Sequence, residues 1–461
     1  MANDKIIIIL CDTLRAKSLL HYGNTRSTMP NLNPVVEKDF TVYNTAYAPS
    51  SWTTPSHLSL FTGLYPSQVM ETPTVFSLNP VFKTLPELFR DSGYGTGAFS
   101  ANELVSKKFG FNKGFDSFFQ LWLPDPGMEE LMFSLKGDSR FEKLLTLFRS
   151  MAKKDLRDRT IRGMTENLYK NVFRKVLNDA TPTTNRAMRM LKRYITGNND
   201  KSLFCFVNLM QVHEKYNPPR VTRNRFVKQS REYEEYYKQI TPLDHYALKP
   251  FSGEFIEYLQ LRYEEEILYL DIVIADFIKF LKDNKLYDNC TLVITSDHGE
   301  HFGENGHFAH TFSVFEPLIK IPMYIKWQGR AENHDKTVNK PVMLQDLYST
   351  FLNMTGHWLP CPVSSIDLTS ATKRAWALSQ LPDMSHNIKG CQEKRQSFSI
   401  KELGLEGSSL TAYVFADGTK IIENNGKFSC YDLNIDPGES SAISVSAGYA
   451  EEIKRIKNAV V

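Results

Sequence analysis

The densest group of chemically active residues lies between residues 297 and 310. This segment carries four of the 11 histidines of the chain together with three carboxylates, and glycines interrupt it. Imidazole and carboxylate side chains bind divalent cations and also serve as general acids and bases. Ordinary surface loops seldom concentrate both kinds of side chain, so the segment predicts a metal or catalytic site. The candidate site residues in it are Asp297, His298 and His310.

Two other segments place polar residues directly after apolar runs. Asp12 follows the apolar residues 6–10, and His213 lies in the segment that follows a similar run at 203–207. A carboxylate in such a place is a suitable ligand for a hard cation, and a histidine can move a proton near neutral pH. Each also has a plain structural explanation when taken singly, as a capping carboxylate or a packed loop histidine.

Hydroxyl side chains gather before a further apolar segment. Pro55 suits the first turn of a helix, so Thr53 or Thr54 is expected at the N-cap, where free N–H groups and the helix dipole favour anions. These hydroxyls would do no more than cap the helix if the segment stood alone.

The apolar runs are expected to be strands that position these residues. Residues 6–10, 204–207 and 291–294 are continuous apolar stretches, which is typical of parallel strands covered on both faces. Helical periodicity separates them at 84–92 and 256–284. Strands that alternate with helices predict an α/β fold with a mostly parallel central sheet flanked by helices. Ligands bind at the carboxyl ends of such strands, which is where the polar residues lie.

Length and composition exclude several classes of protein. The 461 residues are 42% hydrophobic and 23% charged, which is not the composition of a disordered, collagen-like or coiled-coil chain. A net charge of +3 is too small to indicate a nucleic-acid partner. No apolar run reaches the roughly 18 residues of a membrane span. The spacing of the cysteines is neither that of a disulfide framework nor that of a zinc site. The short N-terminal apolar run does not resemble a signal peptide, so a cytoplasmic protein is expected.

The pattern of segments along the chain predicts two regions. Residues 1–330 would form a catalytic domain and residues 331–461 a smaller α+β subdomain, with antiparallel strands in 395–435. A basic helical insertion is expected at about 125–200, since residues 134–195 hold 16 Lys/Arg and 6 Asp/Glu. It would be a solvated insertion or a collar that attracts an anionic substrate or a lipid surface.

Taken in order, these segments resemble the sulfatase branch of the alkaline phosphatase superfamily, and the resemblance covers nearly the whole chain. It implies that family's fold, with a smaller C-terminal subdomain, and its metal-dependent ester chemistry. The segments that carry it are IIIILCDTLRA at 6–16, MPNLN at 29–33, TTPSHLSLFTGLYP at 53–66, VHEKYNPP at 212–219, TSDHGEHFGENG at 295–306, PVMLQDLYSTFLNMTG at 341–356 and CYDLNIDPGE at 430–439.

The departures from the family pattern bear on function. Sulfatases oxidise a Cys or Ser at the first signature position to formylglycine, but this chain has Thr53, so no formylglycine is expected. A threonine sulfate would need a second displacement at sulfur, whereas water or another alcohol can resolve a threonine phosphate. Family members with Thr here, such as lipoteichoic acid synthases and nucleotide pyrophosphatase-type diesterases, act on phosphate esters. His57 replaces the signature Arg, and residues 98–102 replace the sulfate-gripping G-K-W-H segment.

The resemblance implies a single cation site. Asp12, Asp297 and His298 would bind one divalent ion, and the hydroxyl of Thr53 would be a fourth ligand. Cys11 stands where the family often has a second Asp, so the donor set favours Mn²⁺ or Mg²⁺, with Zn²⁺ and Ca²⁺ as alternatives.

The resemblance also implies roles around that ion. Thr53 would be the nucleophile and His57 would orient it, while His213 or His310 would contact the transferred group or protonate the leaving oxygen. Arg15 and Asn102 are substrate-binding candidates. We therefore expect a metal-dependent hydrolase or transferase of phosphate esters, with phosphodiesters favoured. Its substrate would be an anionic ester, which a polymer or a lipid headgroup could carry. A nucleic-acid substrate is not expected. The alternatives are a sulfuric ester hydrolase and a catalytically silent anion-binding protein.

Overall fold

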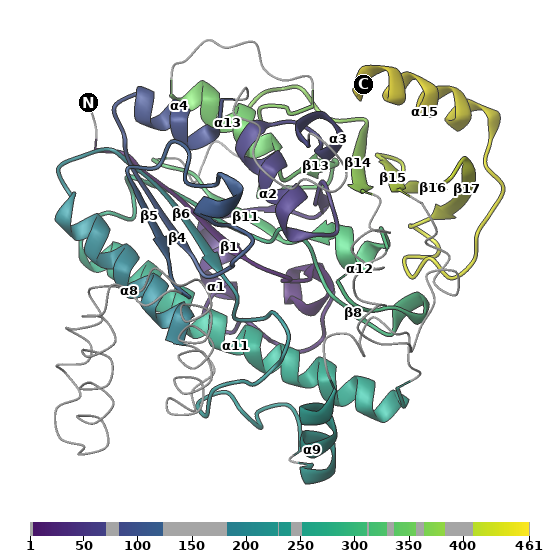
Figure 1. The fold of residues 1–461 in the computed structure, drawn as a ribbon, viewed down its shortest axis with the longest axis horizontal. Helices are drawn as coiled ribbons and strands as arrows, with labels where there is room; N and C mark the ends of the chain where they lie inside the picture. Colours follow the sequence, from purple (N-terminus) through teal and green to yellow (C-terminus); the bar gives the residue numbers. More distant parts are fainter. Residues whose placement is uncertain are drawn as a thin grey trace, which may run out of the picture.

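The computed structural model describes residues 3–70, 83–122, 182–228, 230–240, 251–310, 313–329, 336–355, 364–382 and 409–460. An eight-stranded, mostly parallel sheet lies at its centre (Figure 1). Its strands, in spatial order, are β12 (Thr337–Val338), β2 (Thr41–Tyr43), β11 (Met323–Lys326), β7 (Cys290–Thr295), β1 (Lys5–Cys11), β6 (Leu203–Leu209), β4 (Gly95–Ser100) and β5 (Ser117–Gln120).

The register of the sheet brings three strand ends to one edge. Ile8 of β1 pairs with Phe206 of β6 on one side and with Val293 of β7 on the other, and all three strands are parallel. The pairs continue to Cys11 with Leu209 and to Leu10 with Thr295. The residues that follow these strands therefore leave the sheet side by side.

Both faces of β1 are buried, as its continuous apolar sequence predicts. Successive side chains of a strand point to opposite faces, so Ile7 and Ile9 join one hydrophobic cluster and Ile6 and Ile8 join the other. Helix α11 (Gly253–Asp283) and helix α8 (Pro182–Gly197) cover the first face; α2 (Thr53–Thr62), α4 (Leu85–Asp91) and α13 (Asp346–Met354) cover the second (Figure 1).

The remaining elements complete the layers. The helices are α1 (Asn33–Asp39), α3 (Pro66–Val69), α9 (Arg231–Gln239), α12 (Glu316–Ile319) and α15 (Ala447–Val460), and the strands are β3 (Ala46–Tyr47), β8 (His301–Phe302), β9 (Phe308–Ala309), β10 (Lys320–Ile321), β13 (Val342–Met343), β14 (Trp376–Leu381), β15 (Leu410–Phe415), β16 (Thr419–Asn424) and β17 (Lys427–Asp432). The 3₁₀ turns are η1 (Ala16–Ser18), η2 (Leu20–Tyr22), η3 (Lys107–Phe109) and η4 (Glu304–Gly306).

A smaller antiparallel sheet follows the central one. Its strands are ordered β14-β15-β16-β17, and three of them confirm the prediction of antiparallel strands within 395–435. The layer begins later than the boundary expected at residue 330, because β12 belongs to the central sheet and α13 packs into the cluster beneath it. The fold class predicted from the sequence is confirmed.

Only the last part of the basic insertion expected at about 125–200 lies within the described residues. Residues 123–181 lie outside the described residues. Helix α8 is not part of an insertion, because its side chains Ala187, Leu191 and Ile195 are buried in the central cluster and it forms a layer of the fold. Within the described residues, no helix is long and apolar enough to cross a lipid bilayer.

Candidate active site

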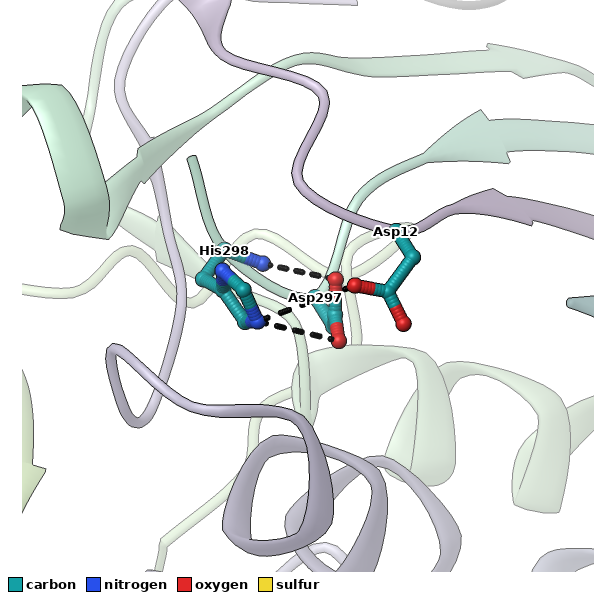
Figure 2. Close-up of side chains that lie close together, drawn as sticks. All are labelled: Asp12, Asp297 and His298. Atoms are coloured by element: carbon teal, nitrogen blue, oxygen red, sulfur yellow. Dashed lines mark hydrogen bonds and ion pairs between the residues drawn. The ribbon is translucent and has the colours of Figure 1, made fainter. Parts of the chain in front are cut away.

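Three acidic and imidazole side chains meet beyond the ends of β1 and β7. Figure 2 shows Asp12, Asp297 and His298 pointing toward one another, and their candidate ligand atoms all lie within 4.8 Å of one another. His298 Nε2 is 3.5 Å from Asp297 Oδ2 and 3.8 Å from Asp12 Oδ1. All three side chains are fully buried. The proximity follows from the parallel register, because Asp12 and Ser296 are the first residues past paired strand ends.

Each carboxylate of this group has one oxygen held by the protein and one without a hydrogen-bond partner. Asp12 Oδ2 accepts a 2.7 Å hydrogen bond from the Asn102 side chain, and Asp297 Oδ1 accepts from the backbone N–H of Thr13 and of His298. Asp12 Oδ1 and Asp297 Oδ2 are buried without a donor. Because buried polar atoms are normally satisfied, these two oxygens mark where a cation fits.

The electrostatics of the group agree with a cation site. Burial raises the pKa of Asp12, and the charge of Asp297 adds to that effect. Burial raises the pKa of Asp297 to about 7. His298 donates from Nδ1 to the carbonyl of Gly299 at 3.0 Å, which leaves Nε2 facing the carboxylates. Burial, and then the nearby His310, lower the pKa of His298 to about 4, so its imidazole is neutral at pH 7 and could bind a cation.

Thr53 lies beside this group as the first residue of α2. Its Oγ1 is 3.4 Å from His298 Nε2, and its side chain is buried. The N-cap is Trp52, which makes no side-chain capping bond, and not Thr53 or Thr54 as the sequence suggested. The chain is extended at Trp52 and turns helical one residue later, so Thr53 is freed from capping. The N-terminus of α2 therefore lacks a side-chain acceptor and suits an anion.

His57 packs behind Thr53, one helical turn along α2. Its Nδ1 lies 2.8 Å from the carbonyl oxygen of Thr53 and 3.7 Å from Asp297 Oδ2. Its Nε2 lies 3.4 Å from the side-chain nitrogen of Asn208, and burial lowers the pKa of His57 to about 3. A neutral imidazole thus contacts the backbone of Thr53. The orienting role expected for His57 would act through that backbone, not through the hydroxyl.

His213 and His310 lie together on the other side of the group. Their ring centroids are 4.7 Å apart, and the ring of His310 stacks on that of His298 at 4.9 Å. Burial lowers the pKa of His213, but Asp12, Glu214 and Glu300 outweigh burial and leave the pKa above its ordinary value. The acidic side chains around His213 therefore favour its protonated form.

Glu300 is a residue that the sequence reasoning missed. It is fully buried, its Oε1 is 3.3 Å from His310 Nδ1, and its Oε2 accepts a 3.0 Å hydrogen bond from the hydroxyl of Tyr216. The only signal in the sequence is its place two residues after His298 within the histidine-rich segment.

The two substrate-binding candidates have protein partners. Asn102 follows β4 and donates to Asp12. Arg15 is 1% exposed, donates to Glu304 at 2.6 Å and lies with its guanidinium carbon 5.4 Å from the ring centre of Phe302. Cys11 belongs to the hydrophobic cluster on one face of the sheet, so the place of the family's second Asp is apolar. These contacts indicate positioning roles, and substrate binding by Asn102 or Arg15 stays a prediction.

Known proteins are similar to this chain in sequence and in fold. The profile of the family described as "Sulfatase" matches residues 4–357. Arylsulfatase K of Canis lupus familiaris is 20% identical over 467 residues, which cover 95% of this chain and 78% of the relative. The crystal structure of phosphonate monoester hydrolase of Agrobacterium radiobacter superposes with a TM-score of 0.70 at 17% identity and covers 99% of this chain and 96% of that one. BT4656, in complex with its substrate D-glucosamine-2-N,6-O-disulfate, superposes with a TM-score of 0.64 at 15% identity and covers 99% of this chain and 97% of that one.

Proposed function

Because the chain belongs to the sulfatase family, we propose that it is a metal-dependent hydrolase or transferase that acts on phosphate esters through Thr53, with phosphodiesters favoured. The observation that supports Thr53 as nucleophile is its Oγ1, 3.4 Å from His298 Nε2 and within the first turn of α2. A solved relative in complex with a sulfated sugar supports an anionic ester as substrate. The ester would be carried by a polymer or a lipid headgroup.

Asp12, Asp297 and His298 would hold the divalent ion, with Mn²⁺ or Mg²⁺ favoured. When bound, such an ion lowers the pKa of an adjacent alcohol and neutralises anionic charge. The first turn of α2 favours the negative charge of the substrate at the same place. His57 holds the carbonyl of Thr53 and thereby fixes the start of the helix.

In the reaction, Thr53 Oγ1 gives its proton to solvent water and attacks phosphorus, and the bond from phosphorus to the leaving oxygen breaks. His213 Nε2 would give a proton to that oxygen, since the pKa of His213 is raised and its Nδ1 already donates to the carbonyl of Glu214 at 2.9 Å. Water or a second alcohol then gives its proton to His213 and displaces Thr53 from phosphorus, and Thr53 Oγ1 takes up a proton from solvent, which restores the enzyme. His310, held by Glu300, would contact the transferred group.

Phosphate is favoured over sulfate because Thr53 is not a substrate for the oxidation that yields formylglycine. Without an aldehyde hydrate, release of sulfate from Thr53 would need a second displacement at sulfur. The sulfatase names among the relatives support the other choice, a sulfuric ester hydrolase, so the two ester classes must be compared directly.

The test is a parallel assay of bis(4-nitrophenyl) phosphate, 4-nitrophenyl phosphate and 4-nitrophenyl sulfate, with and without Mn²⁺. We expect Mn²⁺-dependent turnover of the diester, and peptide mass spectrometry after an acid quench should find a 4-nitrophenyl phosphoryl group on Thr53. Thr53→Ala should lose turnover but keep its fold, and Thr53→Ser should keep part of the activity. Full activity of Thr53→Ala contradicts the nucleophile. Faster sulfate release identifies a sulfatase, and turnover of none of the three esters favours a silent anion-binding protein.

A further inference from the structure

Three consecutive glutamates in the middle of α11 are buried. The exposed fractions of Glu264, Glu265 and Glu266 are 0%, 0% and 1%. Carboxylates are rarely buried without partners. Glu264 contacts the loop at residues 24–26, whereas Glu265 and Glu266 contact two parts of the loop between β6 and α9. Glu264 binds Asn24 and Arg26, Glu265 binds Arg262 and the backbone N–H groups of Phe226 and Val227, and Glu266 binds Gln211 and Asn217.

Glu266 holds both sides of the loop that carries His213. Its Oε2 accepts a 2.5 Å hydrogen bond from the side-chain amide of Gln211, and its Oε1 accepts a 2.7 Å bond from the backbone N–H of Asn217. These residues lie two positions before and four positions after His213. One carboxylate therefore spans the loop.

The loop that carries His213 is also held by a residue next to Asp12. The hydroxyl of Thr13, the residue after Asp12, donates a 3.1 Å hydrogen bond to the carbonyl of Val212. With Gln211 and Asn217 tied to Glu266, the backbone is held immediately before His213 and on both of its flanks. The ring of His213 can then keep its place 4.7 Å from that of His310.

We propose that Glu266 is a positioning residue that fixes His213 for protonation of the leaving group. The inference rests on the proposed function of His213. Burial raises the pKa of Glu266 to about 8, so a carboxylate here costs folding free energy that an apolar side chain would not. Such a cost at a residue that touches no reacting atom is expected where a loop of the active site must be held in place.

The chain offers a matched control on the same helix. Asp271 is also buried, and its carboxylate accepts hydrogen bonds from the backbone N–H groups of Asn31 and Leu32, at a loop that carries none of the site residues. Asp271→Ala thus removes the same kind of loop anchor without touching the loop of His213.

The first measurement compares two esters that differ only in the leaving group, 4-nitrophenol against the more basic phenol. Because a poor leaving group depends on general acid catalysis, Glu266→Ala should slow the phenyl ester at least about tenfold more than the 4-nitrophenyl ester. Asp271→Ala should change both rates by the same factor. Glu266→Gln should recover most of the loss, since its oxygen can still accept from Asn217 and the Gln211 amide can turn. Equal slowing of both esters by Glu266→Ala would overturn the inference.

A second measurement needs no turnover. With ¹³C-labelled histidine, the ring resonance of His213, assigned with His213→Asn, should shift or broaden in Glu266→Ala and stay in place in Asp271→Ala. An unchanged resonance in Glu266→Ala overturns the inference whatever the activity. If wild-type protein turns over no ester, the proposed function fails, and this spectrum still decides whether Glu266 positions His213.

Discussion

The side-chain amide of Asn102 donates a 2.7 Å hydrogen bond to Asp12 Oδ2 and leaves Asp12 Oδ1 without a donor. Asn102 follows β4 and Asp12 follows β1, so residues from the ends of two strands together fix the direction of the Asp12 carboxylate. Partners behind a metal ligand usually set its direction, so Asn102 would have that role if Asp12 binds the proposed ion.

Asn102→Ala should therefore weaken Mn²⁺ binding by about 10–100-fold, because Asp12 is then free to rotate. Isothermal titration calorimetry measures the change. Asn198→Ala is the control, since Asn198 directly follows α8 and its side chain donates to the carbonyl of Tyr194 within that helix. Equal affinities of Asn102→Ala and wild type would show that Asp12 needs no partner.

Removal of divalent ions should destabilise the protein. Without a cation, Asp12 and Asp297 are two buried carboxylates whose pKa values are raised by burial, so their charges oppose folding. Mn²⁺ at 100 times its Kd should add about 2.7 kcal/mol to the free energy of unfolding. Thermal melts with Mn²⁺ and with EDTA measure this. The Tm of Asp297→Asn should not rise with Mn²⁺. A wild-type Tm that does not change with Mn²⁺ would argue against the site.

Gly299 should not tolerate a side chain. A Cβ there would come within 2.0 Å of the carbonyl oxygen of Pro317 and 3.2 Å of Arg15 Cβ. Gly299→Ala should cost about 1–3 kcal/mol of stability and displace the adjacent His298, so that Mn²⁺ binding weakens as well. Urea unfolding and metal titration give both values. Gly253→Ala is the matched control, because nothing lies within 4 Å of its Cβ and it should be neutral or slightly stabilising. Wild-type behaviour of Gly299→Ala would contradict the close approach.

Glu266 should make stability depend on pH. Burial raises its pKa from 4.5 to about 8, so the folded state binds more protons than the unfolded state between these values. The free energy of unfolding of wild type should therefore fall as pH rises from 5 to 8, relative to Glu266→Gln, by at most about 1.4 kcal/mol per pH unit. Urea unfolding of both proteins at pH 5, 6.5 and 8 measures the difference. A difference that is constant with pH would mean that Glu266 titrates normally in the fold.

Several elements could be predicted because their determinants are local. Continuous apolar runs indicated β1, β6 and β7, and helical spacing indicated α4 and α11 within a few residues of their observed bounds. Asp12 and Asp297 could be singled out because a polar residue directly after a buried parallel strand must lie at the ligand-binding edge of the sheet.

Other features depend on packing between distant segments. Helix α8 carries enough charge to look like part of a solvated insertion, yet Leu191 and Ile195 pack on the sheet. Thr53 looked like a helix cap, but whether a hydroxyl caps or faces a site depends on the backbone at Trp52, which the surrounding fold determines.

The sequence by itself determined the order of strands and helices and the residue types at the strand ends, since periodicity and side-chain chemistry are properties of neighbours along the chain. Only the tertiary structure decided which partners hold those residues: Asn102 for Asp12, Glu300 for His310 and Glu266 for the loop of His213. Such pairs are made by residues as far apart as 90 positions, and a hydrogen bond across that separation leaves no periodic trace in a single sequence.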